Sequence, residues 1–167
     1  MLALLLLHLL AAGALVFTPV KAPPEILPPS LGPLQLVSWL DGEDAHLAIN
    51  KLHHKRIPMV EGYVAEYKGS VAERLAEATL WLAQSQDEKE AEELLEKMVQ
   101  GLKQGNPSFG HYRSWAYAGQ TIHEVLGSGQ RHFIFRNGPW VVWAAVDPNL
   151  PPQVMDDLLA IGRPPEA

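Results

Sequence analysis

Residues 130–146 read QRHFIFRNGPWVVWAAV, and this stretch decides the fold that we expect. Two apolar runs flank Asn137-Gly138, a pair of residues that tolerates positive φ and is the strongest short signal of a β-hairpin. With these two as the turn residues, Phe135 faces Trp140 across the hairpin. The stretch therefore predicts two adjacent antiparallel strands, over residues 130–136 and 139–146.

The two faces of this hairpin differ less in polarity than a sheet with one solvated face requires. In the predicted register one face is the natural core beneath the helices and carries Phe133, Phe135, Trp140, Val142, Ala144 and Val146. The other face carries His132, Ile134, Val141 and Trp143, with His132 opposite Trp143. Either the chain's own elements cover this second face, or it binds a partner protein or an apolar ligand. We take these four residues as a candidate partner-binding site.

Upstream of the hairpin, residues 110–118 and 120–126 read as two further strands, with Gly119 and residues 127–129 at the joints. Downstream, Asn149 and Pro151 open a closing helix. Its apolar residues are Val154, Met155, Leu158 and Ile161.

The preceding helix has the clearest pattern in the chain. Ser85 and Glu88 form a predicted capping box at its start, and Gly105 and Pro107 end it. Its apolar stripe recurs at the helical spacing and reads as core rather than as a cofactor site. The stripe consists of Ala91, Leu94, Leu95, Met98, Val99 and Leu102.

An earlier amphipathic helix starts near residue 44 and stops before Pro58. Residues 59–68 read as a strand that ends in a turn at Gly69-Ser70. Residues 71–83 fit a helix or a strand, and we favour a strand for their second half. Together these elements predict an α+β fold in the order α-β-β-α-β-β-β-β-α. The sheet would be antiparallel, of about six strands, with helices packed mainly on one face.

Residues 1–17, MLALLLLHLLAAGALVF, are almost wholly apolar. We expect residues 1–22 to be a signal peptide or an N-terminal membrane anchor, and the sequence leaves both open. Residues 23–33 are rich in proline and read as a stalk. Residues 34–167 would then form a single extracytoplasmic domain, periplasmic or on the cell surface.

Composition excludes several classes of function. The 19 acidic and 13 basic residues give a net charge of −6, which opposes nucleic-acid binding. The chain has no cysteine, so it forms no disulfide, thiolate catalyst or zinc–thiolate site. Seven histidines appear, without the spacing of a metal motif. We expect no metal ligands and no cofactor.

Nothing in the sequence forms a catalytic signature, so we name no catalytic residue. The leading hypothesis is an exported or membrane-tethered, non-enzymatic module that binds a protein or assembly partner through the aromatic sheet face. The alternative is an extracytoplasmic small-ligand or metal-binding protein that uses histidines. A small hydrolase is the third hypothesis.

Overall fold

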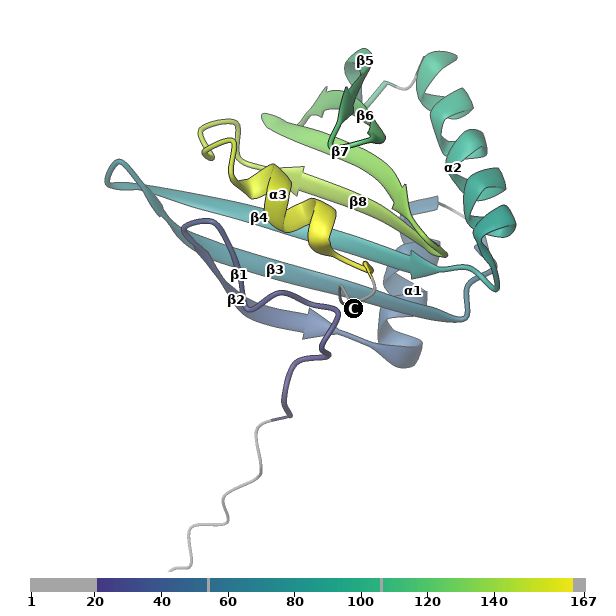
Figure 1. Cartoon of the computed structure of the whole chain (residues 1–167), viewed down its shortest axis with the longest axis horizontal. Helices are drawn as coiled ribbons and strands as arrows, with labels where there is room; N and C mark the ends of the chain where they lie inside the picture. Colours follow the sequence, from purple (N-terminus) through teal and green to yellow (C-terminus); the bar gives the residue numbers. More distant parts are fainter. Residues whose placement is uncertain (1–20, 54, 106, 164–167) are drawn as a thin grey trace, which may run out of the picture.

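The computed structural model describes residues 21–53, 55–105 and 107–163. They form one antiparallel sheet and three helices (Figure 1), which confirms the α+β class. The sheet has eight strands rather than about six, in the order β1-β2-β3-β4-β8-β7-β6-β5. The elements are β1 Ser30–Leu31, β2 Leu34–Leu40, α1 Gly42–His53, β3 Glu61–Val71, β4 Arg74–Gln84, α2 Glu88–Lys103, β5 Gly110–Tyr117, β6 Gln120–Gly127, β7 Gln130–Asn137, β8 Trp140–Val146 and α3 Val154–Ala160.

The two additional strands, β1 and β2, come from the start of the described chain. β2 pairs with β3, and its pairing is irregular between Leu36 and Ser38, which breaks the alternation that would mark a strand in the sequence. Leu27 and Leu31 are buried in the main core, and the backbone carbonyl of Pro28 accepts a hydrogen bond from the Tyr67 hydroxyl at 2.9 Å. The packed domain therefore includes at least the second half of the proline-rich segment 23–33.

The apolar stretch expected to be a leader or an anchor falls within residues 1–20, which lie outside the described residues. Among the described residues, no helix has the length and apolar character needed to cross a membrane. The signal-peptide and anchor alternatives thus stay predictions.

The ambiguous stretch after β3 is a strand nearly throughout, because β4 spans Arg74–Gln84. The predicted turn at Gly69-Ser70 is wrong, since both residues lie inside β3 and the turn falls at Ala72-Glu73. The latter pair adopts positive φ, 47° and 64°, without a glycine. Gly69 is required for another reason: a Cβ there would lie 2.5 Å from the carbonyl oxygen of Pro33.

The hairpin between β7 and β8 has a different register from the predicted one. Asn137 pairs with Trp140, so the turn residues are Gly138-Pro139 instead of Asn137-Gly138. As a result, Phe135 lies opposite Val142 rather than Trp140. His132 lies opposite Ala145 rather than Trp143. A shift of two positions keeps every side chain on its predicted face, so the predicted faces of the hairpin are correct.

The physical reason for this register lies in the Asn137 side chain. It is buried, and its amide nitrogen donates to the backbone carbonyls of Leu159 at 3.1 Å and Ile161 at 2.7 Å. These carbonyls belong to the end of α3 and would otherwise lack a partner. Asn137 thus caps the end of α3 from a distant strand. The hairpin turn therefore lies at residues 138–139 instead of residues 137–138.

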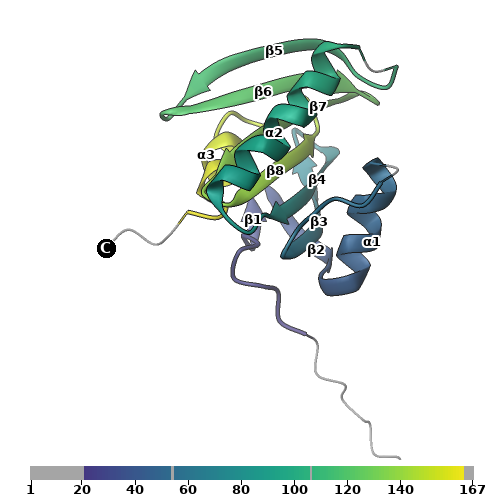
Figure 2. The same ribbon diagram turned by 90° about the vertical axis from the view of Figure 1, so that its right-hand side faces the viewer.

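Helices cover both faces of the strongly twisted sheet (Figure 2). The face predicted to lie beneath the helices packs against one of them, α3, and against the segment around Leu27 and Leu31. α2 and α1 lie on the second face, which carries Ile134, Val141 and Trp143. Two of the three helices therefore share the face that alternation alone would have left to solvent.

The start of α2 is also shifted from its prediction. Asp87, not Ser85, is the N-cap, and its carboxylate accepts from the backbone N–H of Glu90 at 2.8 Å. The Glu90 carboxylate accepts in return from the N–H of Gln86 at 3.0 Å. Ser85 is still part of the sheet end, because its N–H donates to the carbonyl of Pro139 at 2.9 Å. The α2 start thus has a reciprocal cap two residues later than predicted, in which Glu90 bonds the N–H of the residue before the N-cap and not that of the N-cap itself.

Candidate functional site

A groove of about 660 Å³ lies on the second sheet face, between α1 and α2. Its floor comes from the two central strands. Trp81 of β4 and Trp143 of β8 are directly paired, and Ala83 and Val141 form the next pair on the same face. Two adjacent indole rings make this floor broad and apolar.

The walls of the groove are also mainly apolar. α1 contributes Ile49 and Leu52, and the Leu52 side chain is 56% exposed at the rim. α2 contributes Leu94 and Met98 from its apolar stripe. Gly101 of α2 lines the groove as well, and a Cβ added there would meet no atom within 4 Å. Gly101 thus leaves open space in the α2 wall of the groove.

The four residues predicted as a partner-binding site come together here, although they do not form an open surface. His132, Ile134 and Val141 are less than a tenth exposed, and Trp143 is half-buried. His132, Val141 and Trp143 line the groove, whereas Ile134 packs beneath α2. Of the two interpretations of this face, coverage by the chain's own helices is the observed one, and the groove is the part they leave open.

Beside one wall of the groove, a small aromatic cluster surrounds His132, and the hydrogen bonds of its imidazole favour the neutral form. The Trp143 indole N–H donates to His132 Nδ1 at 3.0 Å, so this nitrogen carries no proton. His132 Nε2–H therefore donates to the carbonyl of Gly127 at 3.1 Å. The Phe109 ring packs 4.9 Å from the imidazole and 5.3 Å from the indole, measured between ring centroids.

Burial and these bonds predict a loss of stability in mild acid. Desolvation lowers the pKa of His132 below its usual 6.5, and desolvation with nearby Lys103 lowers the pKa of His123. As the pH falls, the unfolded chain therefore takes up protons at these histidines before the folded chain does. The free energy of unfolding then decreases below about pH 6.5, by at most about 1.4 kcal/mol per pH unit for each histidine. Urea unfolding between about pH 8 and pH 5.5 measures this slope. A His132→Asn variant should show a shallower slope, and an unchanged slope would contradict the assignment to His132.

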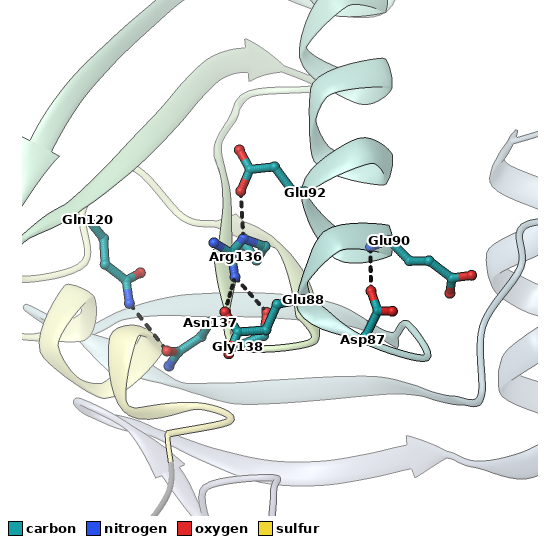
Figure 3. A network of polar contacts seen from close by, with 8 residues as sticks. All are labelled: Asp87, Glu88, Glu90, Glu92, Gln120, Arg136, Asn137 and Gly138. Atoms are coloured by element: carbon teal, nitrogen blue, oxygen red, sulfur yellow. Dashed lines mark hydrogen bonds and ion pairs between the residues drawn. The ribbon is translucent and has the colours of Figure 1, made fainter.

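A second, more polar pocket of about 540 Å³ lies on the opposite flank of α2, against β6 and β7. Arg136 is one of the residues that line it, and Figure 3 shows its polar contacts. The guanidinium donates to the carboxylates of Glu92 at 2.8 Å and Glu88 at 3.3 Å, and to the carbonyl of Gly138 at 2.9 Å. Because these bonds use most of its donors, Arg136 fastens α2 to the β7–β8 turn and is not free to bind a ligand.

Glu124, the one deeply buried carboxylate among the described residues, also has hydrogen-bond partners for both its oxygens. It is 2% exposed, and Arg113 binds both its oxygens, at 2.9 and 3.0 Å. Arg131 and the indole of Trp115 donate to it at 3.0 and 3.1 Å. Burial raises its pKa, but the two guanidinium groups outweigh this effect and the net shift is downward. Such an anion braces β5, β6 and β7 and is a poor general acid or base at neutral pH.

The histidines considered as metal ligands do not gather. Within the described ranges, no three His, Asp or Glu side chains are placed to hold a metal ion. His123 Nδ1 instead lies 2.9 Å from the Tyr112 hydroxyl, and His53 Nδ1 lies 2.9 Å from the carbonyl of Ile49.

Comparison with known proteins gave no match: no family model, curated protein or solved structure is significantly similar to this chain. Function must therefore be argued from the site itself.

The prediction missed the α1 wall and Trp81, which lie far from the β7–β8 hairpin in the sequence. The α2 stripe gave no separate signal, because Leu94-Leu95 and Met98-Val99 have the spacing of an ordinary core-facing stripe. Leu94 and Met98 lie on the side of the α2 stripe that lines the groove.

Proposed function

We propose that this protein is a non-enzymatic binding protein of the cell envelope, whose α1–α2 groove binds the apolar chain of a small amphiphilic ligand. The observation that carries this proposal is the groove with its paired Trp81 and Trp143 floor. Small-molecule sites are concave, mostly apolar and roughly 300–1,000 Å³ in volume, and this groove lies within that range.

The geometry favours a ligand over the protein partner expected from the sequence. A protein-docking surface of standard size exposes about 800 Å² on each partner, with aromatic residues at its centre. Here the aromatic residues lie at the bottom of a groove, and Val141 is only 3% exposed. A narrow chain can reach this floor, whereas a flat protein surface would contact mainly the outer faces of α1 and α2.

The cell-envelope location rests on the apolar N-terminal residues 1–17. A protein delivered or held at a membrane meets amphiphilic molecules at that surface, which agrees with an apolar binding groove. The absence of a catalytic arrangement in the sequence and the full engagement of Glu124 support binding without chemistry.

Gly101→Leu should block the groove without disturbing the fold. The new side chain enters open space on α2 and replaces a residue that costs a helix interior about 1 kcal/mol relative to better helix formers. We expect saturable binding of the neutral fluorescent amine N-phenyl-1-naphthylamine to the parent protein and at least a tenfold weaker Kd for the variant. Fluorescence titration measures both, and urea unfolding should show equal or higher stability.

Gln100→Leu is the matched control, since it adds the same side chain to an exposed position of α2 that does not line the groove. It should bind the dye like the parent. Equal dye binding by Gly101→Leu and the parent would reject the groove as the site, and so would a loss of the same size in the Gln100→Leu control.

A further inference from the structure

The charges around the groove are not balanced, and this imbalance bears on the ligand's polar end. Three cationic side chains line it: Lys55 and Arg56 in the loop after α1, and Lys97 on α2. None of the three forms an ion pair with any residue in the part of the chain that the structure describes. Lys55 and Arg56 are exposed, so their head groups stand at the mouth of the groove.

The acidic residues of the groove, by contrast, have partners. Glu93 lies 3.9 Å from Lys89, and Glu90 accepts the N–H of Gln86 as part of the α2 cap. The groove lining carries three cationic and two acidic side chains, one of the latter paired with Lys89, whereas the chain as a whole carries a net charge of −6, so this rim differs in charge from the rest of the molecule. Binding sites place complementary charge where the ligand's charged group lies.

We propose that the ligand is an anionic single-chain amphiphile of the fatty-acid class, with its alkyl chain on Trp81 and Trp143 and its carboxylate at Lys55 and Arg56. This inference rests on the proposed function, and adds the charge of the ligand and the direction in which it lies. A guanidinium suits this role because its planar N–H groups match both oxygens of a carboxylate.

The test uses residues 21–167. This fragment contains every core residue that the structure describes, from Leu27 to Ile161, and leaves out the apolar residues 1–17. Urea unfolding of the fragment and of each variant verifies that the fold is intact.

Three ligands built on a twelve-carbon chain separate the contribution of the head group: dodecanoate, dodecanol and dodecyltrimethylammonium, each below its micelle concentration and titrated by displacement of N-phenyl-1-naphthylamine. We expect dodecanoate to bind about tenfold more tightly than dodecanol, because each of the two exposed cations adds a modest attraction for the carboxylate. The cationic ligand should bind most weakly. Salt at about 0.5 M should reduce the preference for dodecanoate, since it screens exposed charges.

Lys55→Glu/Arg56→Glu should abolish the preference for dodecanoate while dodecanol binds as before. The control is Lys51→Glu, one charge reversal of the same kind on an exposed residue of α1 that does not line the groove. It should keep the preference. Equal binding of dodecanoate and dodecanol to the parent would overturn the anionic ligand and leave the apolar groove standing. If none of the three ligands displaces the dye and the dye itself does not bind, the proposed function fails as well. Binding only to dodecanoate-containing vesicles, and not to the monomer, would overturn the single-chain ligand.

Discussion

Trp143→Ala should destabilise the domain by about 3 kcal/mol, the lower end of the range for removing a buried tryptophan, because its side chain is half-buried. The indole packs against Phe109 and the α2 side of the sheet, and its N–H is the hydrogen-bond donor to His132 Nδ1 at 3.0 Å. Removing it leaves a cavity and a buried nitrogen without a partner. The urea midpoint and its slope measure the loss.

Two further variants divide this effect into packing and hydrogen bonding. Trp143→Phe keeps most of the ring contacts and loses the N–H, so it should lose about 1 kcal/mol. Trp81→Ala removes the neighbouring floor indole, for which the structure gives no hydrogen bond or ring pair within the described ranges, and should cost less than Trp143→Ala. A loss of under 1 kcal/mol for Trp143→Ala would show that α2 does not pack on this face as described.

Local signals predicted a large part of this fold. The strands 110–118, 120–126, 130–136 and 139–146 and the two longer helices follow from periodicity and turn residues, and the structure has each within a few residues. The register of the β7–β8 hairpin was not predictable in the same way. It depends on the Asn137 amide, which reaches carbonyls of Leu159 and Ile161, more than twenty positions along the chain.

The other errors have similar causes in tertiary structure. Ala72 and Glu73 form a turn with positive φ that glycine would normally mark, and Gly69, which looks like a turn residue, instead gives room to the Pro33 carbonyl. β2 was not predicted because its irregular pairing near Leu36 interrupts the alternation of polar and apolar residues. In each case a contact between distant segments overrides the local preference of the backbone.

The candidate site was predicted in part. Alternation identified the face that holds His132, Val141 and Trp143, because a solvated face should not be so apolar. It could not show that α2 and α1 cross this face with a gap between them, since the placement of helices over a sheet depends on packing rather than on pattern. The groove, its α1 wall and its cationic rim therefore come from the structure alone.

Arg131→Met should lower the free energy of unfolding by about 2 kcal/mol at neutral pH, because it removes a charge-assisted hydrogen bond to the buried Glu124 carboxylate. The guanidinium is 34% exposed, so the loss stays below that of a fully buried pair. Arg113→Met/Arg131→Met should lose more, since Trp115 is then the only donor left to a carboxylate that is 2% exposed. Urea unfolding at about pH 7 gives both values.

The double variant should also reverse the effect of pH on the Glu124 contribution. In the parent, the pKa of Glu124 is lowered from its usual 4.5, so its stabilisation is complete above about pH 4.5 and is lost as the pH falls through the folded pKa. Without the two arginines, burial outweighs the single Trp115 N–H bond to the carboxylate and raises the pKa of Glu124 above 4.5. In the double variant, the ionised Glu124 carboxylate therefore lowers the free energy of unfolding. This loss is complete above the raised pKa and becomes smaller as the pH falls toward 4.5.

The difference in stability between the parent and the double variant should therefore shrink from about pH 7 to about pH 4.5. The acid titration of His132 and His123 is common to both proteins and cancels in this difference. Adding Glu124→Gln to the double variant removes the titrating group, and the difference between these two variants should then vary with pH because only one retains the carboxyl. A parent-minus-variant difference that stays constant over this range would show that Glu124 does not depend on its arginines for its charge.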